Sequence, residues 1–393
     1  MKPDCSAIDR RIDELLPELE QLARRIHEHP ELRFEEHQAA AWVAEFVEKW
    51  GGVAVERGVG GLPTALRAHT GGAGAARVAI FAEYDALPEI GHACGHNLIA
   101  AGAVGAFVAL AALPELPGRV ELFGTPAEEG GGGKIRLLEA GAFEGLDAAL
   151  MFHPFDRDLL AHPALASSWI RMRFAGAPSH AAIAPWDGRS ALTACLETFR
   201  LIDAQRVHFR DGVRVHGIVV DGGQAVNVIP ERAAAEFSVR APTSSELDRV
   251  RAIVERCARG AAMATGVEVS LSVRAGYREM NNNMTIAQRF GAALSDLGRP
   301  ALVGDATVGA GSTDMGDVSH ALPSIHPWLA ICEPGEAMCH QHAFATAAIS
   351  PRGLQTMAIA AKALARTAAE LIHDGELLAA AKAEHAAARG ATL

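Results

Sequence analysis

Residues 77–97 read RVAIFAEYDALPEIGHACGHN and combine a short apolar run with a cluster of metal-ligand side chains. The run at 78–84 is typical of a buried strand. Cys94 and His96 follow it, and residues two apart on an extended segment face the same side. Asn97 is a favourable helix N-cap and predicts a helix over 98–113. Ligand side chains thus lie in a loop between a strand and a helix, where open α/β sheets usually place their chemistry.

Ligand-type residues also follow two later predicted strands. The strand at 119–124 leads to Glu128 and Glu129, and the strand at 148–152 ends at His153. Each feature alone has an ordinary explanation, because a buried Cys often only fills space, a Glu-Glu pair is usually solvated, and a single His can be a core residue. The carboxyl ends of parallel strands lie on one edge of a sheet, however. Ligand-type residues at the ends of three successive strands should therefore lie close together, which predicts a site for two metal ions.

Composition limits the class of protein. A chain of 393 residues predicts two domains. The net charge of -11 argues against a nucleic-acid partner, since phosphate binding needs a basic surface. Six scattered cysteines, no apolar leader and no long uncharged apolar stretch predict a reduced, cytoplasmic, soluble protein without a membrane partner.

The predicted strands and helices of the segment 168–276 follow a different order from those in the rest of the chain. Its predicted order is β-α-β-β-α-β, the split βαβ pattern of a ferredoxin-like domain. We therefore expect a catalytic α/β domain formed by 1–167 and 286–393, with an inserted α+β domain at 168–285. An exposed sheet edge in the insert could pair with a second copy, which predicts a homodimer. The chain should form a loop over 308–319 and one long helix over 344–373.

Several long motifs resemble the M20 metallopeptidase and amidohydrolase family, and most closely its aminoacylase-1-like and aminobenzoyl-glutamate hydrolase branch. They are EYDALP at 83–88, HACGHN at 92–97, GTPAEEGGGGK at 124–134, HAA at 180–182, GQAVNVIP at 223–230 and STDMG at 312–316. The resemblance implies a zinc-peptidase-like α/β catalytic domain with an inserted ferredoxin-like α+β domain that serves as a dimerisation domain and lid.

The resemblance also implies a set of metal ligands and a catalytic base. The implied ligands of two divalent metal ions are Cys94, His96, Glu129, His153 and His340. His342 is an alternative to His340, because two histidines stand where the family often shows one. Glu128 would be the general base. A Cys ligand favours zinc, while the imidazole and carboxylate ligands also admit manganese or cobalt.

Other residues are expected to support this site. Asp85 ends its strand beside the ligands and would orient a histidine. By resemblance, His180 would reach the active site of the neighbouring subunit and stabilise the oxyanion, and Asn227 would help to bind the substrate. Arg240 and Arg278 are alternative partners for a substrate carboxylate. His92 is interpreted as structural.

The function that the resemblance implies is hydrolysis of an amide bond beside a free carboxylate. Candidate substrates are an N-acyl amino acid, a dipeptide or an aminobenzoyl-glutamate-like conjugate. A hydrolytic deaminase or other C–N hydrolase on the same two-metal site, and a non-catalytic metal-binding regulator, are the alternatives. A serine hydrolase lacks support, since the chain has no Gly-x-Ser-x-Gly motif.

Overall fold

The computed structural model describes residues 3–72 and 76–390, and the chain divides into two compact units. Unit 1 comprises Met1–Pro163, Met280–Ala310 and Asp314–Leu393, and unit 2 comprises Ala164–Glu279 with Gly311–Thr313. The insert therefore begins and ends a few residues earlier than the predicted 168–285. Unit 2 also includes the short later segment Gly311–Thr313, which the order of predicted elements along the chain does not suggest.

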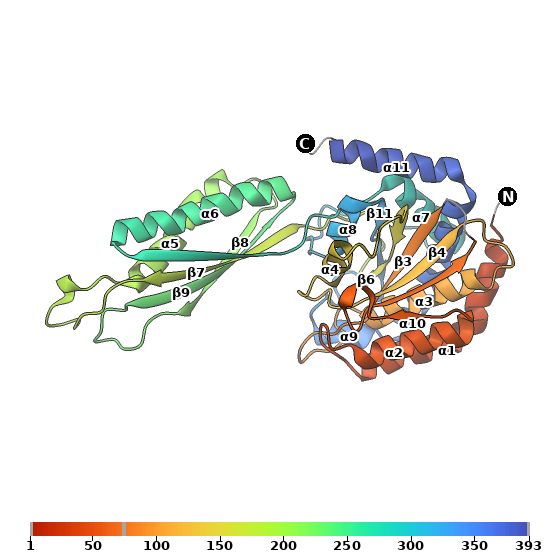
Figure 1. The fold of residues 1–393 in the computed structure, drawn as a ribbon, viewed down its shortest axis with the longest axis horizontal. Helices are drawn as coiled ribbons and strands as arrows, with labels where there is room; N and C mark the ends of the chain where they lie inside the picture. Colours follow the sequence, from red (N-terminus) through yellow and green to blue (C-terminus); the bar gives the residue numbers. More distant parts are fainter. Residues whose placement is uncertain (1–2, 73–75, 391–393) are drawn as a thin grey trace. The chain divides into compact units, whose positions relative to one another are not determined.

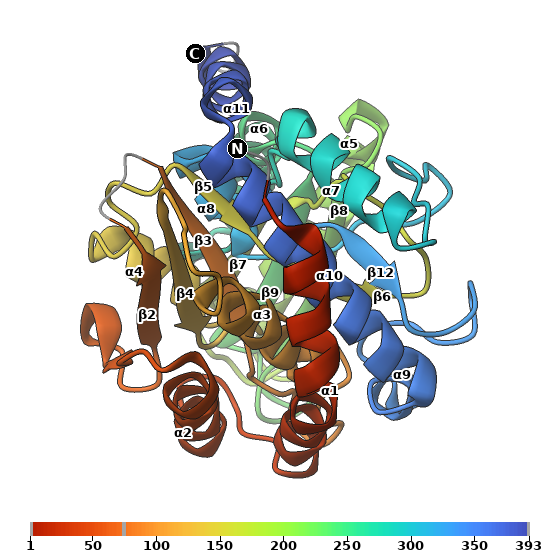
Figure 2. The same cartoon turned by 90° about the vertical axis from the view of Figure 1, so that its right-hand side faces the viewer.

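Unit 1 is built on a mixed six-stranded sheet in the order β1-β2-β4-β3-β5-β11 (Figures 1 and 2). Strands β4, β3, β5 and the edge strand β11 are parallel to one another, and β1 and β2 are antiparallel to their neighbours. A separate parallel pair joins β6 to β12. The strands are β1 (Glu56–Arg57), β2 (Leu66–Gly71), β3 (Arg77–Glu83), β4 (Arg119–Thr125), β5 (Ala148–Leu150), β6 (His153–Phe155), β11 (Ser324–Ile325) and β12 (Trp328–Ala330).

Helices enclose this sheet. Helices α1, α3 and α10 pack on one another, and α3 and α10 contact β3 (Figure 2). The helices of unit 1 are α1 (Cys5–Glu28), α2 (His37–Phe46), α3 (His96–Ala111), α4 (Gly133–Glu139), α7 (Met284–Asp296), α8 (Met315–Ala321), α9 (His342–Ala347), α10 (Pro351–His373) and α11 (Gly375–Gly390). Every residue from His96 to Leu110 of α3 is buried, so this helix forms the centre of the core. Within 3–72 and 76–390, no helix combines the length and the apolar character needed to cross a membrane.

The structure corrects three predicted elements of unit 1. The predicted loop at 308–319 contains the start of α8, and the predicted helix at 344–373 is two helices, α9 and α10. Ser350 caps α10 by accepting the backbone N–H of Gly353, and Pro351 occupies its first turn, where proline is favourable. The run at 148–152 is not one strand, because β5 ends at Leu150 and β6 starts at His153 in a different sheet.

Unit 2 has the predicted order of elements. They are β7 (Ala166–Ala175), α5 (Ala191–Gln205), β8 (Arg214–Asp221), β9 (Arg232–Ala241), α6 (Ser244–Thr265) and β10 (Glu268–Ala275). The strands form one antiparallel sheet in the order β10-β7-β9-β8, and α5 and α6 pack on it and on each other (Figure 1). This is the split βαβ topology of a ferredoxin-like domain. Strand β8 lies at one edge, and Ile218 and Val219 in it are exposed.

Candidate metal centre

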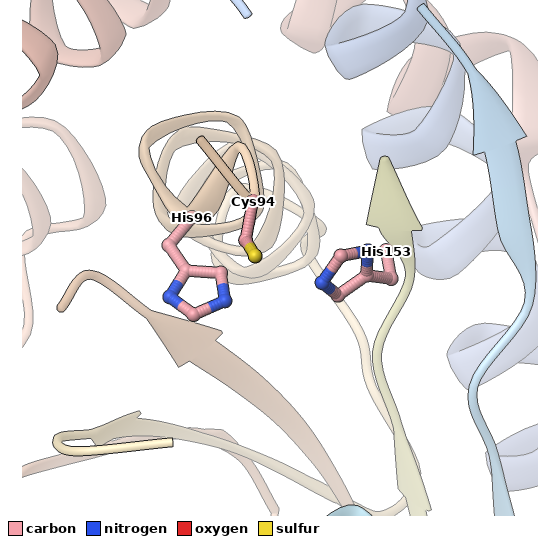
Figure 3. A group of neighbouring side chains, drawn as sticks. All are labelled: Cys94, His96 and His153. Carbon is pink, nitrogen blue, oxygen red and sulfur yellow. The ribbon is translucent and has the colours of Figure 1, made fainter. Parts of the chain in front are cut away.

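Cys94, His96 and His153 direct their side chains toward one point in unit 1 (Figure 3). A ligand atom from each lies within 4.8 Å of the others. Cys94 lies in the turn just before α3, His96 is the first residue of α3, and His153 is the first residue of β6. Cys94 also groups with Glu129 and His340, and His96 with Glu128 and Glu129, by the same criterion. The five predicted ligands and the predicted base thus lie together.

Gly95 sets the direction of the first two ligands. It has a left-handed backbone conformation, φ 75° and ψ 25°, and occupies the cap position of α3. A Cβ atom at this position would lie 2.8 Å from Cγ of Pro154, so the approach of β6 also requires glycine. The predicted cap, Asn97, is instead inside the helix. Its buried side-chain amide donates to the carbonyls of Ala23 and Ala348, at 3.2 and 3.3 Å.

Asp85 and His96 are hydrogen bonded within the site. Nδ1 of His96 lies 3.1 Å from Oδ1 of Asp85 and 2.8 Å from its carbonyl oxygen. Nδ1 therefore carries the proton, which leaves the lone pair of Nε2 for a ligand. Burial alone would raise the pKa of Asp85, but His96 holds that pKa below its usual value. Burial opposes the charged form of His96, and Asp85 outweighs it and raises the pKa of the imidazole.

The ring of His153 is fixed by a hydrogen bond and by two neighbouring rings. Its Nδ1 lies 2.7 Å from the carbonyl oxygen of Pro154, so Nε2 is again the free ligand atom. Burial and the neighbouring His96 lower the pKa of His153 to about 4. The ring centroid of His326 lies 5.4 Å from that of His153. His326 was not predicted, although its His-Pro pair repeats the one at His153 and β12, just after it, pairs with β6.

The Glu128–Glu129 loop is held by three carboxylates from distant segments. Glu36 accepts the N–H of Ala127 at 2.9 Å, Asp85 accepts that of Glu129 at 2.8 Å, and Asp314 accepts that of Lys134 at 2.9 Å. Ala127 has φ 60°, which is unusual for a residue with a side chain. A backbone in this conformation must be held by its surroundings.

The two glutamates have opposite electrostatic environments. Burial and the charge of Glu129 raise the pKa of Glu128 well above its usual value. Burial would also raise the pKa of Glu129, but the neighbouring side chain of His340 lowers it. One carboxylate thus favours holding a proton while its neighbour favours the charged form. Such a division suits one general base and one ligand.

His340 is the histidine that joins the site. Its Nε2 lies 3.6 Å from Oε1 of Glu129, and its backbone N–H donates to the carbonyl of Ala93 at 3.0 Å. His340 has φ 68°, a second unusual backbone conformation beside the ligands. His342, the alternative, is the exposed first residue of α9 and belongs to none of the ligand groups among the described residues.

A buried ion-pair triad lies beside the ligands and was not predicted. Lys134 is fully buried, and its Nζ contacts Glu83 and lies 2.7 Å from Oδ1 of Asp314. Burial raises the pKa of Asp314 to about 6, against the opposing effect of Lys134. Oε2 of Glu83 lies 3.5 Å from Nε2 of His96. A lysine after four glycines gives no local signal that it is buried.

The residues present fit a metal centre. Nε2 of His96, Oε1 of Glu129 and Oε2 of Glu83 are buried and make no hydrogen bond. Such atoms are costly unless a ligand satisfies them. Five carboxylates converge here with one lysine, so bound divalent cations would offset their negative charge; they are Glu83, Asp85, Glu128, Glu129 and Asp314. One thiol, three imidazoles and a carboxylate form a donor set that suits zinc.

His180 and Asn227 belong to unit 2, where the fold brings their two loops together. The N–H of Ala181 donates to the carbonyl of Asn227 at 3.0 Å, and His180 forms a β-bridge with Val228. Nδ1 of His180 accepts backbone N–H groups from Ala182 and Ile183, so Nε2 carries the ring proton.

The structure locates Arg240 and Arg278, the alternative partners for a substrate carboxylate, but does not favour either. Arg240 lies on β9 and donates to Oγ of Ser312 at 3.3 Å, and Arg278 follows β10. His92 is buried beside His27, and burial lowers its pKa to about 3.

Comparisons with known proteins agree with this geometry. Residues 79–370 match the model of Peptidase family M20/M25/M40. The chain is 39% identical over 388 residues to the mouse Xaa-Arg dipeptidase, covering 94% of this chain and 89% of that protein. It is 34% identical over 306 residues to one of the subunits of p-aminobenzoyl-glutamate hydrolase from Escherichia coli, covering 71% of this chain and 62% of that protein.

A solved structure has the same fold. A Bacillus subtilis protein described as a dinuclear metal binding peptidase from the M20 family superposes with a TM-score of 0.74 at 22% identity, covering 92% of this chain and 99% of that chain. The matched family model spans the site and most of the fold, and the chain therefore belongs to Peptidase family M20/M25/M40.

Proposed function

We propose that this hydrolase cleaves an amide or peptide bond beside a free carboxylate with the help of two divalent metal ions. The observation that carries the proposal is the convergence of Cys94, His96, Glu129, His153 and His340 beside a second carboxylate, Glu128. A non-catalytic regulator would need the ligands but not a second glutamate with a raised pKa.

The five ligands would hold the metal ions, with zinc expected and manganese or cobalt as alternatives. When bound, the metals lower the pKa of a water molecule and polarise the scissile carbonyl. Asp85 would keep the proton of His96 on Nδ1, so that Nε2 stays available as a ligand. His153 would be held in the matching tautomer by the carbonyl of Pro154.

Glu128 would move the proton. Its carboxylate accepts a proton from the attacking water and then delivers that proton to the leaving amine nitrogen. The raised pKa of Glu128 suits a group that must hold the proton between these steps. The bonds from Glu36, Asp85 and Asp314 to the loop backbone would keep this carboxylate in position.

We further propose that the enzyme is a homodimer in which His180 serves the partner's active site. The exposed residues of the edge strand β8 support pairing with a second copy. The Nε2–H of His180 would donate to the oxyanion as it forms, and Asn227 on the adjoining loop would bind the substrate.

The relatives guide the choice of substrate. The mouse relative is named for dipeptides that end in arginine, and the Escherichia coli relative for p-aminobenzoyl-glutamate. Both substrates have an amide bond next to a free α-carboxylate. We propose dipeptides with a basic C-terminal residue as the first class, because the mouse relative matches over nearly the full chain.

A substrate panel with defined metals tests this function. The metal-free protein, and protein reloaded with zinc, manganese or cobalt, would be assayed on Ala-Arg, Ala-Lys and Ala-Glu dipeptides, N-acetyl-arginine and p-aminobenzoyl-glutamate. Ammonia release would be measured in parallel to detect a deaminase. We expect metal-dependent peptide cleavage with the basic dipeptides fastest. Hydrolysis that survives exhaustive chelation, or ammonia release without amide cleavage, would reject the proposal.

A further inference from the structure

Cys94 and Cys339 are neighbours although 245 positions separate them in the sequence. The backbone N–H of His340 donates to the carbonyl of Ala93 at 3.0 Å, which brings the two cysteine-bearing segments side by side. Cys339, together with burial, raises the pKa of the Cys94 thiol well above its usual value, which agrees with a Cys339 side chain beside it. All six cysteines are reduced, Cys94 is buried and Cys339 is half-buried.

We propose that Cys94 and Cys339 are a disulfide-forming pair that reacts with small disulfides such as oxidised glutathione when Cys94 is not bound to metal. Disulfide formation needs two thiols on closely approaching backbones, and the contact between the segments supplies this. A coordinated thiolate has its lone pair committed to the metal, so metal binding protects the pair.

The reaction balances as two thiol–disulfide exchanges. Cys339 is the less buried of the two residues, so its sulfur attacks first, breaks the S–S bond of glutathione disulfide and releases one glutathione thiol. The sulfur of Cys94 then attacks Sγ of Cys339 and releases the second glutathione, which carries away the Cys94 proton. Two protein thiols are oxidised and one glutathione disulfide is reduced to two thiols.

The expected consequence is loss of metal binding. Cys94 belongs to the ligand group with His96 and His153 and also to the group with Glu129 and His340. A bond to Cys339 removes its sulfur from both groups. It also constrains the residue that directly precedes His340. The oxidised chain would therefore be unable to assemble the full ligand set until a thiol reductant restores it.

The test treats metal-free and zinc-loaded full-length protein with oxidised glutathione. Free thiols would be counted, the intact mass measured, and disulfides mapped by peptide mass spectrometry. Cys339→Ser removes the attacking thiol and leaves Cys94. Cys332→Ser is the matched control, because Cys332 lies in the same segment and its thiol contacts the carbonyl of Ala337 instead. Zinc affinity would be measured before and after oxidation.

We expect the metal-free wild type and Cys332→Ser to lose two thiols, to lose the mass of two hydrogen atoms and to yield a peptide that links Cys94 to Cys339. Their zinc affinity should fall at least about tenfold, because even loss of a group that only supports a metal ligand typically costs about 10- to 100-fold. Dithiothreitol should restore the affinity. Zinc-loaded protein and Cys339→Ser should form no such link.

Three results would overturn the proposal: both thiols survive in the metal-free wild type, Cys339 stops at the mixed disulfide with glutathione, or zinc affinity is unchanged in the linked protein. The inference does not depend on the proposed substrate. Failure of the reduced, zinc-loaded enzyme to cleave dipeptides would reject the function while leaving the thiol count unaffected.

Discussion

Asp85 accepts the backbone N–H of Glu129 at 2.8 Å through Oδ2. Its other carboxylate oxygen faces Nδ1 of His96 at 3.1 Å. One carboxylate thus fixes the ring of a ligand from α3 and the backbone of the loop that carries the base. The site is therefore assembled by a residue that we expect to touch neither the metal nor the substrate.

Replacing Asp85 by Asn should weaken metal binding. The neutral amide keeps the size of the side chain but removes the charge that favours a proton on Nδ1 of His96. Loss of such an orienting partner typically costs about 10- to 100-fold in metal affinity. Competition with a chromophoric chelator measures it. Asp156→Asn is the control, since Asp156 is also buried and accepts a backbone N–H, from Gly335; an equal loss there would contradict the role of Asp85.

Replacing Lys134 by Met should strongly destabilise the fold. The change leaves Glu83 and Asp314 buried without their lysine, and breaking a buried pair costs about 3–5 kcal/mol. Urea unfolding of metal-free protein measures the loss. Lys382→Met removes a lysine that pairs with Asp147 while half exposed, and should cost less than about 1 kcal/mol. Similar losses of unfolding free energy in both variants would show that the buried triad stabilises the fold no more than an exposed ion pair does.

Glu36 should make the metal-free protein less stable as the pH rises. Burial raises its pKa from 4.5 to about 7, so the folded state binds the proton more tightly than the unfolded state does. The stabilisation is complete below pH 4.5 and is lost as the pH rises through 7, by an amount on the order of 3 kcal/mol.

The variant Glu36→Gln tests this pH dependence. The amide oxygen can still accept the N–H groups of Phe34 and Ala127, while the charge is absent. Urea unfolding between pH 5 and 8 should show a flatter stability profile than that of the wild type. Glu31→Gln is the control, because Glu31 accepts backbone N–H groups at the start of α2 in a partly exposed position. Unchanged curves for Glu36→Gln would refute the assignment.

Mixing two inactive variants should restore activity if His180 acts across a dimer. A His180→Ala chain keeps its own base and ligands, and a Glu128→Gln chain can lend an intact His180. After dissociation and reassociation, each mixed dimer should contain one working site, so a sizeable fraction of wild-type activity should return. His208→Ala, an exposed histidine of the same unit, should be active alone. Demonstrated subunit exchange without recovery would exclude the cross-subunit role.

The sequence predicts best those elements that local pattern determines. Strands β3 and β4 are buried in a parallel sheet and read as continuous apolar runs, so both were predicted within a residue or two. The alternating strands and amphipathic helices of unit 2 also gave its order of elements. Ligand-type residues at the ends of such strands follow directly, which is why Cys94, His96 and the pair Glu128–Glu129 could be singled out, while the resemblance to the family implied which glutamate is the ligand.

The features that sequence missed depend on contacts between distant segments. His153 lies beside Cys94 and His96 as expected, but it was placed at the end of the wrong strand, because its own strand pairs with Trp328–Ala330, far along the chain. Glu36 and Lys134 look like ordinary surface charges, and only tertiary packing buries them. The break before Pro351 carried a local signal, a capping Ser and a first-turn Pro, that an alanine-rich helical pattern concealed.

The proposed mechanism depends most on the division of roles between Glu128 and Glu129. The direct measurement is metal content together with kcat for Glu128→Gln, with Glu129→Gln as its matched partner. We predict that Glu128→Gln keeps the metal content of the wild type and loses about 10²- to 10⁴-fold in kcat, while Glu129→Gln loses metal. Turnover by Glu128→Gln that falls only in proportion to lost metal, or does not fall, would contradict the assignment of Glu128 as the base.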